Sequence, residues 1–203
     1  MATLTDQALA LPPPAELPRP RTLLVGTAYA TVAAVTAFVG LFGVYFAERA
    51  AALKAGTTWI DTGTISLPPG GMMLTTMVMS TVTMAWGAYA IRRDDRSHAY
   101  IALGLTALFG VAVINQTIFN YKSMGLTVVG KDASVQALLI FTITGAHLVM
   151  VAAGVIFIGL MAFRALAGQY SSRQTDGVVA ASIFWYATVA VYTIIYFGIY
   201  VAK

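Results

Sequence analysis

Five long stretches without a charged residue constrain this chain more than any other feature of its sequence. They cover residues 23–47, 71–91, 99–119, 135–163 and 178–201, and every Asp, Glu, Lys and Arg lies outside them. Hydrocarbon penalises charge, and about 20 apolar residues are enough for a helix to cross a bilayer. The sequence therefore predicts an all-α integral membrane protein, built as a bundle of five transmembrane helices.

The composition agrees and excludes several other classes of protein. Only 10% of the 203 residues are charged and 59% are hydrophobic, whereas a soluble domain carries about 25% charged residues. The net charge of +4 comes from side chains between the spans, so membrane topology explains it and we expect no nucleic-acid partner. The chain has no cysteine, which excludes disulfides, thiolate catalysis and cysteine metal ligands.

The N-terminal residues differ from the rest of the chain. Prolines between residues 12 and 20 break any helix there, and no basic segment precedes a short apolar core, so we expect no cleavable signal. Residues 1–21 are predicted to be a Pro-rich cytoplasmic tail, and residues 22–203 the membrane domain. Seven Lys and Arg fall on the N-terminal side of the spans and five on the other side. This bias predicts the N-terminus inside and the C-terminus outside.

Few strongly polar side chains fall within the spans, and these are the first candidate site residues. Asn115 and Gln116 end the third span, and His147 is the only histidine inside a span. A polar group in hydrocarbon costs free energy unless it is hydrogen-bonded. We therefore expect Asn115 and Gln116 to bond a facing helix or to line a wet crevice. His147 could bond Gln116, Thr144 or a backbone carbonyl of a neighbouring helix, contact a lipid headgroup or water, or have a catalytic or metal role.

Two further patterns concern the first and the last span. Gly26, Ala30 and Ala34 recur every fourth residue, and small residues let membrane helices approach closely. We expect this face of the first span to contact another helix. In the last span, tyrosines recur every fourth residue from Tyr192 to Tyr200. This stripe predicts a packing face with its hydroxyls near the headgroups.

Five short motifs follow one another along the chain. They are Gly40 to Ala50 (GLFGVYFAERA), Leu67 to Gly70 (LPPG), Gln116, Phe141 to His147 (FTITGAH) with Gly154, and Gly177-Val178 with Phe184-Trp185-Tyr186. In this order and spacing they resemble subunit III of the heme-copper (cytochrome c) oxidases, in the short five-helix form found in bacteria. The resemblance extends from Leu23 to Val201, which is almost the whole chain.

The resemblance implies a non-catalytic accessory subunit of a respiratory heme-copper oxidase in the bacterial plasma membrane. Heme and copper would then be carried by subunits I and II, and these subunits and phospholipids would be its partners. The chain itself would hold no cofactor, no metal and no catalytic residue. The candidates for helix packing or lipid contact are His147, Gln116, Asn115, Thr144, Trp185 and Tyr186.

The chain departs from the family pattern at its titratable membrane positions. The family's intramembrane glutamates fall on Ala34 and Phe119, and the aspartate of the last helix falls on Ala190. Two family histidines fall on Met150 and Tyr186. Because proton uptake through a membrane needs titratable groups or wet chains, we expect the chain to be a poor proton conduit.

Two alternative functions remain open. The missing carboxylates favour a subunit III-like accessory protein of a nitric-oxide reductase or of another membrane enzyme. A stand-alone transporter could line its path with Asn115, Gln116 and His147. Against the transporter, the sequence has neither the internal repeat nor the broken helix that is typical of that class.

Overall fold

The structure is a computed structural model that describes residues 21–61, 63–130, 134–170 and 174–202. The predicted tail lies outside these residues except for Arg21. Among these residues, five helices are long and apolar enough to cross a membrane, which confirms the all-α, five-helix class. They are α1 (Thr22–Lys54), α2 (Leu67–Arg92), α3 (Arg96–Ser123), α4 (Val135–Leu166) and α5 (Asp176–Ile195), and the π-helix η1 (Tyr196–Val201) continues α5.

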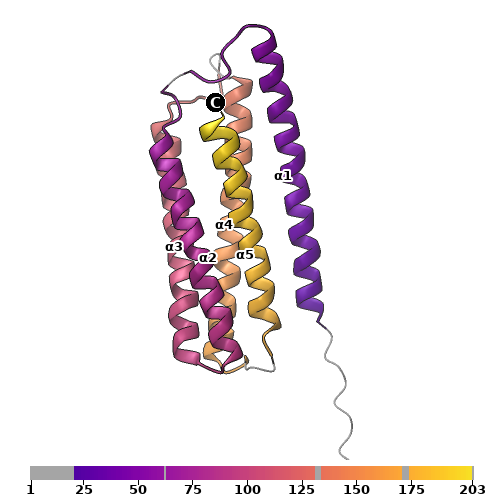
Figure 1. The fold of residues 1–203 in the computed structure, drawn as a ribbon, viewed down its shortest axis with the longest axis vertical. Helices are drawn as coiled ribbons and strands as arrows, with labels where there is room; N and C mark the ends of the chain where they lie inside the picture. Colours follow the sequence, from indigo (N-terminus) through magenta and orange to yellow (C-terminus); the bar gives the residue numbers. More distant parts are fainter. Residues whose placement is uncertain (1–20, 62, 131–133, 171–173, 203) are drawn as a thin grey trace, which may run out of the picture.

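The helices run alternately up and down, and the last helix in the sequence takes a central place (Figure 1). The helix α5 packs against α1, α2 and α4, whereas α1 packs mainly against α5 and stands at the edge of the bundle. On the other side, α3 packs between α2 and α4. We call the end of the bundle that holds η1 the C-terminal end, where α1 and α3 end and α2 and α4 begin.

The helices are longer than the charge-free spans. The helix α1 continues past residue 47 through Glu48 and Arg49 to Lys54, so its last turns can stand beyond the hydrocarbon. The helix α2 begins at Leu67 and includes Pro68 and Pro69 in its first turn. Proline fits there because the first N–H groups of a helix have no intrahelical acceptor to lose.

Trp185 on α5 is the central packing residue of the bundle. Its side chain is fully buried, and its indole N–H donates to the Ser80 hydroxyl on α2 over 2.9 Å. Glycines on α3 and α4 make room for the ring, since a Cβ atom at Gly110 or Gly154 would lie 2.8 Å from it. The absence of a side chain at these two positions therefore lets α5 approach both helices.

The packing of α1 differs from the expectation based on its small residues. Large side chains of α1, including Phe38, Phe42 and Tyr45, are buried. Gly26 and Ala30 are exposed, and no described atom lies within 4 Å of a Cβ built on Gly26. Within the described chain, Gly26 and Ala30 do not lie at a helix contact, whereas Ala34 of the same stripe packs against the core, and the aromatic side chains supply contact area on this helix.

A substitution at Gly110 tests the close approach of the helices. We expect Gly110→Ala to destabilise the bundle by about 1–3 kcal/mol, because the new methyl group would overlap Val155 and press on the Trp185 ring. Gly104→Ala on the same helix is the matched control, since it meets nothing within 4 Å. Unfolding of the purified chain in detergent measures both variants. Equal stability of the two variants would contradict this packing.

Acid should weaken the N-terminal cap of α3. Asp95 accepts a hydrogen bond from the backbone N–H of His98 at 3.2 Å, and this bond lowers the pKa of its carboxyl group. A carboxyl group with a lowered folded pKa stabilises the fold above its unfolded pKa, about 3.9 for Asp. That contribution is lost as the pH falls through the folded pKa.

We expect Asp95→Asn, which caps a helix without titrating, to show a smaller loss of thermal stability than the unaltered chain between about pH 5 and pH 3. Melting curves of both proteins in the same detergent at the two pH values measure this difference. An identical pH dependence in the two proteins would show that the Asp95 cap does not titrate as inferred.

Candidate functional site

His147 lies inside the bundle on α4. Only 2% of the residue is exposed, and its Nε2 atom lies 3.1 Å from the Thr188 carbonyl oxygen on α5. The tautomer with a proton on Nε2 donates to this carbonyl. The imidazole ring also lies beside the Tyr192 ring, with the two centroids 5.2 Å apart. His147 therefore has a backbone carbonyl of a neighbouring helix as its partner.

The first turn of α2 receives hydrogen bonds from two other helices. Tyr192 on α5 donates its hydroxyl to the Gly70 carbonyl at 3.0 Å, and Gln116 on α3 donates its amide to the Pro69 carbonyl at 3.2 Å. A carbonyl oxygen has two lone pairs, so it can accept these bonds in addition to those of its own helix. The two bonds fix the start of α2 against α5 and α3.

Thr144 joins α4 to α3. It donates to the Ile140 carbonyl at 2.6 Å and accepts a hydrogen bond from the Tyr121 hydroxyl at 2.8 Å. Thr144 lies one helical turn before His147 on α4, and both residues are buried. The two side chains nevertheless have separate partners, because His147 bonds α5 whereas Thr144 bonds α3.

The structure adds a buried amide that the sequence interpretation missed. Asn120 is 3% exposed and its amide lies 3.2 Å from the Met73 sulfur atom on α2. The predicted third span ended at residue 119, which assigned Asn120 to a loop. Its place four residues after Gln116 was the available signal, since residues with that spacing share a helix face.

The six candidate residues do not form a single site. His147, Thr144 and Trp185 are buried and Gln116 is half-buried, whereas Asn115 and Tyr186 are exposed on the outside of the bundle. The stripe that runs from Tyr192 to Tyr200 is also largely internal, because both of these end residues are at most 3% exposed. Tyr192 and Tyr200 therefore lie at packed positions, as the predicted packing face requires, and the Tyr192 hydroxyl bonds the first turn of α2.

The described residues do not fit a heme or copper site. They contain no group of three or more His, Cys, Asp or Glu side chains that could hold a metal ion. His98 at the start of α3 is bonded to Asp95, and the Nε2 atom of His147 faces the Thr188 carbonyl. Since heme and copper need histidine or sulfur ligands that converge on the metal, these two histidines cannot supply such a site.

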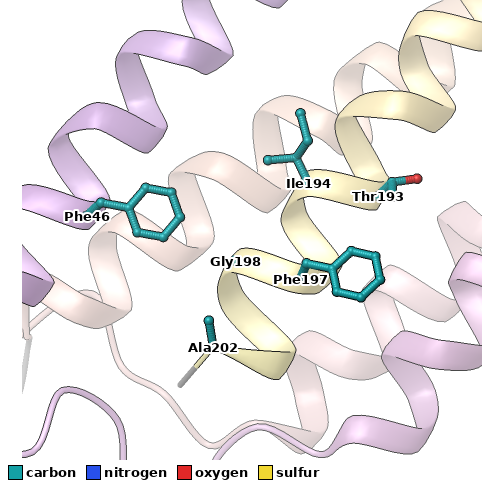
Figure 2. A pocket seen from close by; sticks show the side chains of 6 residues that line it. All are labelled: Phe46, Thr193, Ile194, Phe197, Gly198 and Ala202. Carbon is teal, nitrogen blue, oxygen red and sulfur yellow. The ribbon is translucent and has the colours of Figure 1, made fainter.

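An apolar groove lies between α1 and the C-terminal end of α5 (Figure 2). Its volume is about 380 Å³. The groove is lined by Phe46, Thr193, Ile194, Phe197, Gly198 and Ala202. The single hydroxyl among them, on Thr193, already donates to the Val189 carbonyl. The groove therefore offers apolar contact to a ligand and little polar recognition.

Comparison with known proteins identifies the family. Residues 20–202 match the family described as cytochrome c oxidase subunit III. The chain belongs to this family. The subunit III identity and accessory role predicted from the ordered motifs are thereby confirmed.

Relatives named cytochrome c oxidase subunit 3 occur in distant organisms. The protein of Corynebacterium diphtheriae is 25% identical over 189 residues, which cover 92% of this chain and 91% of the relative. The protein of Synechocystis sp. is 26% identical, covering 87% of this chain and 74% of the relative. The protein of Petromyzon marinus is 29% identical, covering 83% of this chain and 65% of the relative.

Removal of the Tyr192 hydroxyl tests the bond between α5 and α2. We expect Tyr192→Phe to lower the free energy of unfolding by about 0.5–1.5 kcal/mol, because the ring stays and one buried hydrogen bond is lost. Tyr29→Phe is the control, since Tyr29 is 74% exposed on α1. Denaturant unfolding in detergent compares the variants. A Tyr192→Phe variant as stable as Tyr29→Phe would contradict the assigned bond.

Proposed function

We propose that this chain is a non-catalytic accessory subunit that packs against the catalytic subunit of a respiratory heme-copper oxidase, with subunits I and II as its partners. The observation that carries this proposal is the state of its interior polar groups. His147, Gln116 and Tyr192 each bond a backbone carbonyl of another helix. They hold the bundle together, and the redox chemistry takes place on other subunits.

The same arrangement makes the chain a poor candidate for a proton conduit. The five charge-free spans contain no carboxylate, and proton pathways through membranes depend on such groups or on chains of water. Several interior polar groups bond within the bundle: the Tyr121 hydroxyl donates to Thr144, and the Trp185 indole N–H donates to Ser80. We infer that the subunit stabilises the complex and that protons enter elsewhere.

Phospholipids would be the second class of partner. The groove between α1 and α5 is apolar and faces the membrane side of the bundle, with Phe197 and Ile194 both at least half exposed. It can hold part of an acyl chain. Together with the basic residues on the N-terminal side, these features support a multi-pass protein of the bacterial plasma membrane with its N-terminus inside.

Copurification tests the proposed partners most simply. The chain carries an affinity tag in its native host, and the complex is extracted in mild detergent for heme spectroscopy and identification of its subunits. We expect a heme-containing subunit I and a subunit II to copurify. Copurification without any heme-containing subunit would contradict the proposal. Hemes of a nitric-oxide reductase would assign the chain to that complex.

His147→Leu tests the role of the buried histidine. We expect the assembled complex to keep its turnover and to lose about 0.5–1.5 kcal/mol of stability, because the bond to the Thr188 carbonyl and the ring contact with Tyr192 are removed while an apolar side chain fills the site. Val149→Leu, which changes an exposed side chain of the same helix, is the control. Oxygen consumption per heme and thermal inactivation are measured together. Loss of turnover in a complex of normal assembly would contradict a structural role.

A further inference from the structure

Asn115 is a polar side chain on the outer face of the bundle at the depth of the hydrocarbon. It is exposed, and within the described residues its amide makes no hydrogen bond. Its neighbour Gln116 points to α2 and bonds Pro69, and on its other side Ile114 packs against the core. Because successive residues are turned by about 100° along a helix, Asn115 points away from both packed faces.

The position of Asn115 along α3 sets its depth. The helix runs from Arg96 to Ser123, and at a rise of about 1.5 Å per residue Asn115 lies roughly 8 Å from the middle of the helix. The hydrocarbon core extends about 15 Å to each side of its centre. With the middle of α3 placed at the bilayer centre, Asn115 lies about 7 Å inside the boundary, which is more than a full turn of about 5.4 Å.

The surroundings of Asn115 on this face are apolar. Leu108, Val111, Ile118 and Phe119 are each at least 44% exposed around it, and Ala112 beside them is small and exposed. Lipid tails cannot accept or donate a hydrogen bond, so an amide facing them is left unsatisfied. A transmembrane helix with a polar side chain at the same depth can satisfy the amide.

We propose that the outer face of α3 centred on Asn115 docks a transmembrane helix of another subunit, which hydrogen-bonds the Asn115 amide. This inference rests on the proposed function, because it takes the partner from the oxidase complex. To that function it adds the face of the subunit, on α3, that contacts the partner. It also adds the chemistry of the partner helix, which carries Ser, Thr, Asn, Gln or a free carbonyl opposite Asn115.

The charge on the same face favours a different subunit over a second copy of this chain. Lys122 is exposed and lies two turns beyond Asn115 on α3. A two-fold axis along the membrane normal would set this face against its own copy, with Lys122 opposite Lys122, and α3 itself carries no acidic residue that could lie between them. A helix of another subunit can place an acidic or neutral residue there.

A photo-crosslinker at Phe119 tests the docking face while Asn115 is kept. The variant Phe119→p-benzoylphenylalanine is expressed in the native host, membranes are irradiated, and the complex is purified and analysed by mass spectrometry. We expect an adduct with another subunit of the heme-containing complex. An adduct with a second copy of this chain, adducts with lipid alone, or no adduct would overturn the proposal.

Three second-site variants in the photoprobe background test the amide. Asn115→Leu should lower the adduct yield about 3- to 30-fold, as expected for the loss of one hydrogen bond between membrane helices. Asn115→Gln keeps the amide and should keep most of the yield, and Leu108→Met changes only an apolar neighbour on the same face. An unchanged yield with Asn115→Leu would overturn the role of the amide.

The same preparation separates failure of this inference from failure of the proposed function. Heme subunits that copurify without an adduct at position 119 would contradict the docking face alone. An adduct with a subunit of a heme-free complex would support α3 as a docking face and contradict the oxidase assignment.

Discussion

A buried hydrogen bond between helices is the interaction on which this bundle depends. In hydrocarbon, apolar side chains gain little from leaving lipid, so packing and polar contacts must hold helices together. The bond from the Trp185 indole to Ser80 shows both at once. The ring fills the space left open at Gly110 and Gly154, and its N–H reaches across to α2.

The central place of α5 follows from several such bonds. This helix donates from Tyr192 to the first turn of α2 and accepts from His147 of α4 at the Thr188 carbonyl. The last α-helix in the sequence thus connects two helices that precede it, α2 and α4. These polar groups form hydrogen bonds between helices and are therefore engaged in holding the bundle together. This use of its polar side chains is the physical basis of an accessory role.

The number of spans and their order along the chain could be predicted from the sequence, because charge is excluded from hydrocarbon regardless of how the helices are rotated. The partners of single residues could not be predicted in the same way. Asn115 and Gln116 are adjacent and chemically alike, yet one faces outward and the other bonds Pro69. The helices are apolar on all sides, so hydropathy does not show which face is internal.

Other differences between the predicted and the observed helices also have local physical causes. Asn120 lies just beyond the predicted third span, which ends at residue 119, although α3 continues to Ser123 and buries the amide. The start of α2 was placed after its prolines, although a first turn tolerates them. The sequence predicted a backbone carbonyl of a neighbouring helix as one possible partner of His147. Only the structure shows that this carbonyl belongs to Thr188.

The central claim is that this subunit stabilises an oxidase whose redox centres lie on other chains. The most direct measurement compares the complex purified from cells with and without the gene for this chain, by heme content per catalytic subunit and by oxygen consumption over time. The account predicts equal heme content and equal initial turnover, with faster inactivation when the chain is missing. Loss of heme, or loss of initial turnover at full heme content, would contradict it.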